Sequence, residues 1–352
     1  MSDDARGSNN FDLLRLLLAS MVVLSHCMSC SREPVLSCLR YVGSPRGFGG
    51  PGNVAVQGFF AISGYLVVAS YERSSSLGSY LLKRARRILP AYWAATVFVL
   101  LLGAALSTLN VASFLRSSET WKFTMANIAF ANFLHPSLPG VFSDNPNDLV
   151  NGALWTIKVE VMFYLFVPCL VAACRKFGNV QTLAVLFAMS VIFRACFLHF
   201  HLAKIANQLP GQLSFFLVGT FVHYYRQWFL RHTVWMWLLA ALSGLGLSVL
   251  RWPALQNLST PVAVMCFAVL LPHIANPTRF GDLSYGIYVF HYPVIQAFIS
   301  LGIFHAGPWF AVGITAATVG VLAFASWNLV EAPFLKGRAV SRKKLKALSE
   351  AS

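Results

Sequence analysis

The residues most suited to chemistry are three ionisable side chains inside one apolar segment, FDLLRLLLASMVVLSH. They are Asp12, Arg15 and His26. Arg15 and His26 are eleven positions apart, and on an α-helix that spacing returns to within about 20° of the starting direction after a rise of about 16 Å. The two side chains therefore share one helix face. Because an ionisable residue in a membrane segment needs a partner, a ligand or water, this face is predicted to be functional.

Asp12 occupies a different position on the same helix. It precedes His26 by fourteen residues, about 21 Å along a straight helix, so the two side chains cannot pair directly. We expect Asp12 to lie at the end of the helix and to hold Arg15, three residues later.

A second cluster, SYLLKRARRILPAYW, contains Arg84 and Arg87 just before Pro90, which is predicted to start a new span. Two interpretations stay open. Basic residues at a span end anchor its orientation or contact anionic lipid. Alternatively, two arginines at i and i+3 lie on one helix face and can each bind a phosphate through two N–H groups.

A third cluster, LWTIKVEVMFYLFVP, places Glu160 and Tyr164 on one helix face. Glu160 is predicted about two turns from the outer surface, at a depth close to that of His26. A carboxylate beside the imidazole would fix its tautomer and raise its basicity, as a general base requires. In the alternative interpretation, Glu160 pairs with Lys158 or Arg194 as a structural contact.

A fourth cluster, GDLSYGIYVFHYPV, carries a polar stripe within an apolar span. Ser284, Tyr288 and His291 recur at intervals of four and three residues. A single histidine there is compatible with packing, but the nearby Tyr285 favours a cavity wall. Elsewhere, the segment GFFAISGYL holds Ser63 between two glycines, which permits close helix approach or a helix break.

Composition identifies an all-α, polytopic membrane protein. Of 352 residues, 57% are hydrophobic and 11% are charged, against roughly 25% charged in a soluble domain. We predict about ten transmembrane helices, several of them close to the roughly 20 residues that a crossing needs. The stretch 123–133 is too short to cross and is predicted to be interfacial or re-entrant. The predicted spans are residues 11–29, 53–70, 88–107, 153–173, 180–200, 209–225, 233–250, 259–273, 283–304 and 308–330.

The distribution of basic residues predicts the orientation. With a cytoplasmic N-terminus, 17 of the 27 Lys and Arg residues lie inside, 7 outside and 3 within spans, as the positive-inside rule requires. Both termini are therefore predicted to be cytoplasmic, and no cleavable leader is expected. The net charge of +15 follows from topology and gives no reason to expect nucleic-acid binding. The predicted parts are a cytoplasmic tail (1–9), a membrane domain (10–334) and a basic cytoplasmic tail (335–352).

Cysteine spacing does not indicate a metal site, and none is predicted. Cys27, Cys30 and Cys38 fall in or next to the first predicted external segment. An oxidising compartment would permit one disulfide there, and unpaired thiols are the alternative. The remaining four of the seven cysteines lie in or beside spans and are interpreted as packing residues.

Taken together, these clusters resemble the acyltransferase-3 family over nearly the whole chain. The family has an Arg and a His in its first helix, and Arg15 and His26 match them here, with Asp12 preceding both in the sequence. The RxxR element matches Arg84 and Arg87. The LWxxxxExxFY element is matched by Trp155, Glu160 and Tyr164. The SYxxYxxH element is matched by Ser284, Tyr285, Tyr288 and His291.

The resemblance implies a stand-alone enzyme of the bacterial inner (cytoplasmic) membrane that moves an acyl group, mostly acetyl, to a carbohydrate or glycolipid acceptor. Acyl-CoA, usually acetyl-CoA, is the implied donor substrate, and no permanently bound cofactor is implied. His26 would act as general base and Glu160 would orient it, while Tyr288 or His291 would stabilise the oxyanion. Arg84 and Arg87, assisted by Arg15, would bind the nucleotide phosphates. A covalent acyl-His26 intermediate is the mechanistic alternative.

Two other classes stay open from sequence. A glycoconjugate transporter or flippase would also place charges at mid-depth, but the inverted halves common in transporters are absent. A membrane scaffold or sensor would keep the fold without turnover. The sequence does not identify the acceptor, the length of the acyl chain or the oligomeric state.

Overall fold

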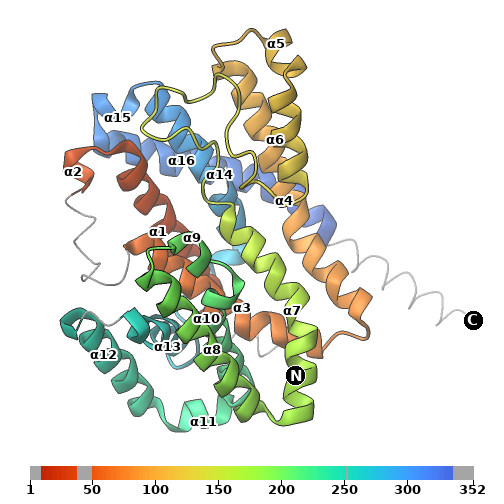
Figure 1. The fold of residues 1–352 in the computed structure, drawn as a ribbon, viewed down its shortest axis with the longest axis vertical. Coiled ribbons are helices and arrows are strands. Elements are labelled where there is room, and N and C mark those ends of the chain that lie inside the picture. Colours follow the sequence, from red (N-terminus) through yellow and green to blue (C-terminus); the bar gives the residue numbers. More distant parts are fainter. Residues whose placement is uncertain (1–8, 38–49, 251–252, 336–352) are drawn as a thin grey trace, which may run out of the picture. The chain divides into compact units, whose positions relative to one another are not determined.

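The structure is a computed structural model that describes residues 9–37, 50–250 and 253–335. Within these ranges every regular element is helical, which confirms the predicted all-α class. Figure 1 labels the main helices. In chain order the elements are α1 (Phe11–Ser31), α2 (Pro34–Ser37), α3 (Pro51–Glu72), α4 (Leu77–Leu106), α5 (Val111–Arg116), α6 (Ser118–Ile128), α7 (Trp155–Phe177), α8 (Asn179–His199), α9 (Ala203–Ala206), α10 (Leu209–Tyr224), α11 (Arg226–Arg231), α12 (Thr233–Leu250), η3 (Pro253–Leu255), α13 (Gln256–Val269), η4 (Pro277–Phe280), α14 (Ser284–Ser300), α15 (Ile303–Ala306), α16 (Pro308–Ser326) and the π-helical η5 (Trp327–Glu331).

Seven helical segments are long and apolar enough to cross a bilayer: α1, α3, α4, α7, α8, α12 and Pro308–Leu335. They coincide with seven of the ten predicted spans. The other three coincide with α10, α13 and α14, which have 16, 14 and 17 residues. These helices are shorter than the roughly 20 residues of a typical crossing. Ten crossings, cytoplasmic termini and the predicted part boundaries therefore stay predictions.

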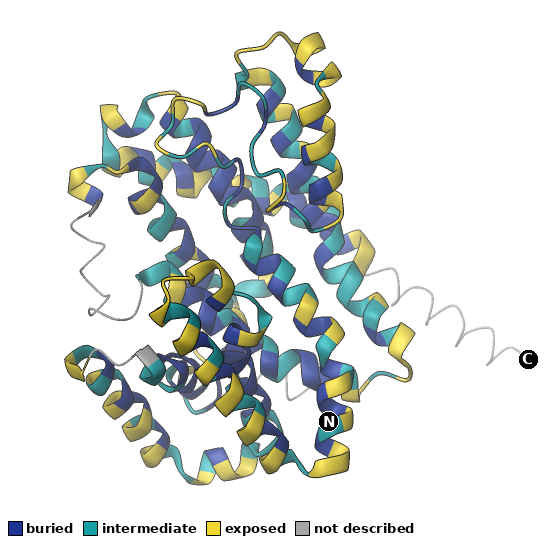
Figure 2. Ribbon diagram, in the orientation of Figure 1, coloured by how far each residue is buried: buried dark blue, intermediate teal, exposed yellow. Residues whose placement is uncertain are grey.

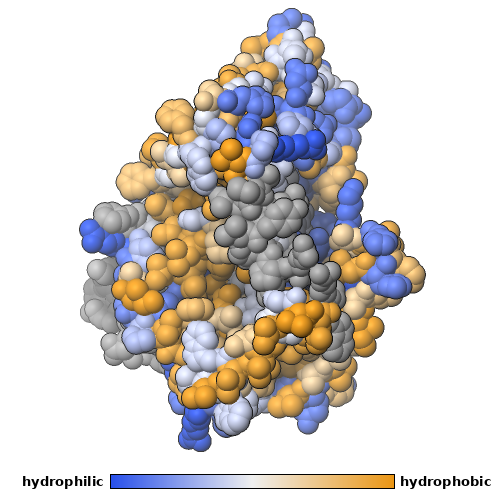
Figure 3. Space-filling model, turned by 90° about the vertical axis from the view of Figure 1, so that its left-hand side faces the viewer, coloured by the Kyte–Doolittle hydropathy of each residue, from blue (hydrophilic) through white to orange (hydrophobic). Residues whose placement is uncertain are grey.

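Apolar side chains cover the outward surfaces of several of the long helices. On α8, Ile192 is 68% exposed, and on α12, Val234 and Val249 are 69% and 68% exposed. Figure 2 shows exposed residues along α12, and Figure 3 shows apolar side chains over much of the face on which α12 lies. Such a surface is a liability in water and is favourable against lipid. The chain is therefore a membrane protein.

The chain forms two compact units, each assembled from two separate stretches of sequence. Unit 1 comprises residues 1–80 and 154–277, and unit 2 comprises residues 81–153 and 278–352. Helix α4 begins in unit 1 and continues through unit 2.

Helix α3 forms the centre of unit 1, where it packs against α1, α7, α10 and α13. Its approach to α10 is close because glycine stands at the crossing on both helices. A Cβ on Gly64 would overlap the carbonyl of Phe216, and one on Gly219 would overlap the carbonyl of Ala61. Small residues at such crossings let helix backbones approach closely. Of the two roles predicted for the glycines of the segment 58–66, close approach is confirmed at Gly64, because α3 continues unbroken through it.

Helix α14 forms the centre of unit 2 and is buried along most of its length. It packs against α16, where Gly286 faces Ala323. On its other side Phe290 meets Phe98 of α4 edge to face, with ring centres 5.5 Å apart.

The backbone of the irregular segment between α6 and α7 accepts hydrogen bonds from a side chain of α14. The Gln296 side chain donates to the carbonyls of Asn147 (2.6 Å) and Leu149 (2.7 Å). In return, Asn151 donates to the carbonyl of Val289 (3.0 Å). Non-helical backbone in a membrane protein is tolerated only where its polar groups are satisfied in this way.

Helix α6 has 11 residues, so the stretch 123–133 is too short to cross, as predicted. Within unit 2, Phe123 packs in an apolar cluster with Phe114 and Leu138. Its placement at the membrane interface stays a prediction.

Candidate functional site

Arg15 and His26 lie on α1, which is one unbroken helix, so the predicted shared face is present. Both side chains are half-buried. The His26 ring donates a hydrogen bond to the backbone carbonyl of Val22, one turn earlier. In a neutral ring the other nitrogen is then a proton acceptor. This tautomer is the form that a general base requires.

The antiparallel packing of α1 against α3 fixes relative depth within unit 1. Three contacts define the register: Ser25 with Gly52, Leu18 with Gly58, and the Phe11 ring with that of Tyr65. By this register Ser63 lies level with Leu13. Thirteen residues, or about 20 Å along α1, separate that level from His26.

Glu160 is held at the level of Ser63. Its Oε1 accepts hydrogen bonds from Ser63 Oγ and from Tyr164 Oη, both at 2.8 Å. The carboxylate therefore lies near the Arg15 end of α1. The predicted pairing of Glu160 with His26 is wrong, because the two groups lie at different depths.

The error in depth has a physical cause in the chain that precedes α7. Val150, Asn151, Ala153 and Leu154 are all buried. The chain is thus already inside the molecule when α7 begins, and counting turns from a membrane surface fails. The alternative pairing of Glu160 with Lys158 or Arg194 is also wrong, because the Glu160 carboxylate bonds to hydroxyls and, within the described residues, to no cation.

In unit 2, two of the predicted site residues lie on one face of α14. His291 is fully buried, and its Nδ1 donates to the carbonyl of Tyr288 (2.7 Å). Nε2 of the neutral ring is then an acceptor, so His291 would stabilise an oxyanion only when protonated. The Tyr288 hydroxyl donates to the carbonyl of Ala153 at 3.3 Å, a long contact. Tyr288 is therefore the better donor of the two.

Arg84 and Arg87 lie inside α4, toward its N-terminal end, and not ahead of a new helix. The 30-residue helix continues through Pro90, so Pro90 does not begin a helix, and the start of the predicted span 88–107 stays a prediction. Proline removes one backbone hydrogen bond, and a long packed helix can tolerate this loss.

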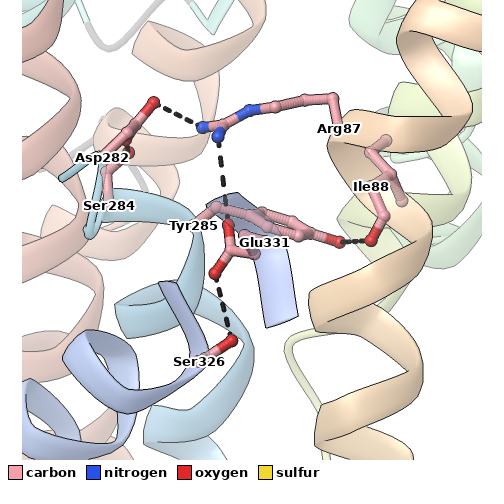
Figure 4. Close-up of polar contacts among 7 residues, drawn as sticks. All are labelled: Arg87, Ile88, Asp282, Ser284, Tyr285, Ser326 and Glu331. Carbon is pink, nitrogen blue, oxygen red and sulfur yellow. Dashed lines mark hydrogen bonds and ion pairs between the residues drawn. The ribbon is translucent and has the colours of Figure 1, made fainter. Parts of the chain in front are cut away.

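Arg87 is surrounded by acidic and aromatic groups of unit 2 (Figure 4). Its Nη2 lies 2.6 Å from Asp282 Oδ2, and its Nη1 lies 3.9 Å from Glu331 Oε2. The guanidinium also lies 5.7 Å from the centre of the Tyr285 ring. The charge of Arg87 is therefore compensated within unit 2, and a phosphate would have to compete with two carboxylates for it.

The other contacts of this cluster bind α14 to its neighbours. Ser284 Oγ donates to Asp282 Oδ1 (2.7 Å), and the Tyr285 hydroxyl donates to the carbonyl of Ile88 on α4 (3.0 Å). Ser326 donates to the buried Glu331 (3.1 Å). Ser284 and Tyr285, predicted as support residues, thus position Asp282, the acidic partner of Arg87, and the start of α14, which follows it.

The remaining support residues are placed without a test of their roles. Trp155 is the first residue of α7. Asp12 is exposed in the first turn of α1, and its predicted pairing with Arg15 stays a prediction. Cys38 lies outside the described residues, so the disulfide question stays open. In the described part of the chain, no three His, Cys, Asp or Glu side chains are grouped as metal ligands.

Sequence reasoning did not predict the contacts of three residues that hold the site in place, which are Asn10, Asp282 and Glu331; it had interpreted Glu331 only as the end of the last span. Asp282 and Glu331 carried a usable signal, since each is an acidic residue next to an apolar span. Asn10 gave no such signal. It lies just before α1, is 2% exposed and is tied to the chain that follows α13.

Asn10 positions α1, because its side chain donates to the carbonyl of Pro272 (2.9 Å) and accepts from the amide of Ile274 (2.8 Å). Asn10→Ala leaves both groups without this partner. We expect it to destabilise the protein by about 1–3 kcal/mol. The melting temperature in detergent would fall, whereas the exposed Ser20→Ala on the same helix should leave it unchanged. Equal melting temperatures would contradict this role of Asn10.

Comparison with known proteins gives a consistent result. The family model described as "Acyltransferase domain" matches residues 8–327. "Nodulation protein 10" of Rhizobium leguminosarum bv. viciae is 29% identical, over 94% of each chain. "O-acetyl transferase" of Shigella phage Sf6 is 30% identical, over 93% of this chain and 96% of its own. "Exopolysaccharide production protein ExoZ" of Rhizobium meliloti is 27% identical, over 82% and 91%. No solved structure matches.

Proposed function

Because the chain belongs to the acyltransferase-3 family, we propose that it transfers an acyl group, most simply acetyl, from acyl-CoA to a hydroxyl of a carbohydrate outside the cytoplasm or linked to lipid. Two relatives support this choice by name, one as an O-acetyl transferase and one as an exopolysaccharide production protein. A multi-pass location in the bacterial inner membrane is part of the proposal.

The observation that carries the chemistry is His26, a half-buried imidazole in an apolar helix whose one N–H is taken by the Val22 carbonyl. The other nitrogen removes the proton from the acceptor hydroxyl while the hydroxyl oxygen attacks the thioester carbonyl. The carbon–sulfur bond then breaks, and the CoA thiolate leaves and takes the proton from His26. The products are an ester and free CoA, and the imidazole is neutral again.

Donor binding is assigned to Arg84 and Arg87, assisted by Arg15. The first two face the same side of α4, and an arginine binds phosphate through two parallel hydrogen bonds. Arg87 already has Asp282 and Glu331 as partners, so its contribution requires a phosphate to displace or share them.

Arg84→Ala tests the donor site and leaves the ion pairs of Arg87 with Asp282 and Glu331 in place. We expect CoA binding to purified protein in detergent to weaken about tenfold or more, the loss of a charge-assisted contact of about 1.5–3 kcal/mol. Arg86→Ala, which removes a cation from the same helix, is the matched control for general electrostatics. Undiminished binding in Arg84→Ala would return this arginine to a role in membrane orientation.

Turnover itself is testable without knowing the acceptor. Membranes that contain the protein are incubated with acetyl-CoA labelled in the acetyl group, and the envelope glycans are extracted. We expect label in base-labile esters of carbohydrate. Label confined to free acetate would contradict carbohydrate transfer.

A further inference from the structure

Arg194, near the end of α8, is a deeply buried cation that the proposed chemistry does not use. We infer that Arg194, with Asn207 and Gln212, forms a binding site for an oxyanion, either a carboxylate or a phosphate ester. The site lies entirely in unit 1, between α8 and the chain that enters α10. The two helices pack side by side.

The partners of Arg194 are few for a residue so deeply buried. It is 8% exposed, and its Nη1 donates to Asn207 Oδ1 over a long 3.3 Å. The guanidinium lies 5.4 Å from the centre of the Phe215 ring. Its Nε is buried without a hydrogen bond. Within the described residues, no carboxylate forms an ion pair with it.

The hydrogen-bond acceptor of Arg194, Asn207 Oδ1, is shared with a second donor. Gln212 Nε2 donates to the same Asn207 Oδ1 at 3.0 Å. One amide oxygen thus serves two donors, and in the described part of the chain most of the five N–H groups of the guanidinium have no acceptor. These N–H groups suit an anion that accepts through two oxygens at once.

Arg87 provides an internal comparison. Its side chain is 16% exposed, and it has two carboxylates as partners. Arg194 is more deeply buried and has none among the described residues. Because an arginine cannot lose its charge in a protein, burial without a counter-ion is costly. An ionisable residue inside a membrane protein that has no counter-ion among the described residues indicates a ligand.

The neighbouring layer of unit 1 is also polar. One turn before Arg194 on α8, the Ser190 hydroxyl accepts from the amide of Ser214 (2.8 Å). Ser214 in turn donates to Asn257 Oδ1 of α13 (2.7 Å). Buried hydroxyls and amides of three helices, α8, α10 and α13, are thus bonded to one another next to the layer of Arg194.

The site lies toward the His26 end of unit 1. Ser25 contacts Gly52 at the start of α3, while Glu72 at the end of α3 bonds His223 at the end of α10 (2.7 Å). The start of α10, which follows Asn207, therefore points to the same end as His26. An anionic group on the sugar acceptor would account for this placement, and that assignment rests on the proposed function. The oxyanion site itself does not.

The test measures binding and needs no turnover. The full chain in uncharged detergent is melted with increasing D-glucuronate or inorganic phosphate, and with glucose or chloride at matched ionic strength. We expect the two oxyanions to raise the melting temperature with a saturating dependence, and glucose and chloride not to. Arg194→Met should lose this response, whereas Lys204→Gln, which removes an exposed cation nearby, should keep it.

A second variant keeps the test informative if Arg194→Met does not fold. Asn207→Asp supplies a carboxylate beside the guanidinium, so it should raise the melting temperature without ligand and abolish the response to oxyanions. A response that is equal in wild type and both variants would overturn the site. So would a wild-type response no larger than that to glucose and chloride.

Nanodiscs separate the two sources of oxyanion. In pure phosphatidylcholine we expect the glucuronate response to persist. If added phosphatidylglycerol raises the melting temperature of wild type alone and suppresses the glucuronate response, a lipid headgroup occupies the site. If phosphatidylglycerol has no effect, the soluble oxyanion is the ligand. An intact acyl transfer with no oxyanion response would overturn this site and leave the His26 chemistry standing.

Discussion

His26→Ala is expected to lower the rate of acyl transfer by about 10² to 10⁴, the usual contribution of a general base. The variant removes the only imidazole of the apolar α1 and leaves the helix otherwise unchanged. The rate is measured as label transferred from acetyl-CoA to envelope carbohydrate at equal protein levels. CoA binding should persist, because His26 acts on the acceptor hydroxyl.

Two controls make this result specific. His26→Asn keeps an N–H donor for the Val22 carbonyl and removes the base, so it should be as inactive as His26→Ala. His232→Ala removes an imidazole at the start of α12 and should be fully active. The covalent alternative is tested by incubating the protein with labelled acetyl-CoA and no acceptor and then quenching with acid. We expect no label on the protein, whereas label at His26 would favour an acyl-His26 intermediate. Near-normal transfer by His26→Asn would contradict the role of base.

Arg87→Met is expected to destabilise the protein by about 3 kcal/mol, the lower end of the range for breaking a buried ion pair. The lower end applies because the side chains of Arg87 and Asp282 are still 16% and 19% exposed. Methionine keeps most of the volume, so the effect isolates the lost charge. It leaves Asp282 and the buried Glu331 without their cation. Thermal or chemical denaturation in detergent measures the loss.

A double variant tests whether the loss comes from the carboxylates. Adding Glu331→Gln to Arg87→Met removes the most buried orphaned charge and should restore part of the stability. Arg86→Met on the same helix is the control and should change stability by less than about 0.5 kcal/mol. An Arg87→Met protein as stable as wild type would contradict the network drawn in Figure 4.

The sequence predicted the helical class, the membrane location and the family, because these depend on composition and on local spacing. Arg15 and His26 were placed correctly on one face, since a continuous helix fixes that relation from residue numbers alone. The glycines of α3 were correctly assigned to close helix approach for a similar reason.

What the sequence did not predict depends on packing between helices. Glu160 was assigned to the depth of His26 because α7 was assumed to begin at a membrane surface. The residues just before α7 are buried, however, and Glu160 bonds Ser63, at a level about 20 Å along α1 from His26. Pro90 was interpreted as the start of a span, but the helix that contains it begins thirteen residues earlier, at Leu77. The partners of Arg87 come from residues about 195 and 244 positions away, and no local pattern reports such contacts.

We propose His26 as the base in acyl transfer to an envelope carbohydrate. The most direct test of this role is mass spectrometry of envelope glycans from a strain that lacks the gene, complemented with wild type or with His26→Ala at equal protein levels. We predict that glycans gain the mass of acetyl groups with wild type only. Glycans that are identical in all strains, or acetylated equally by His26→Ala, would contradict the claim.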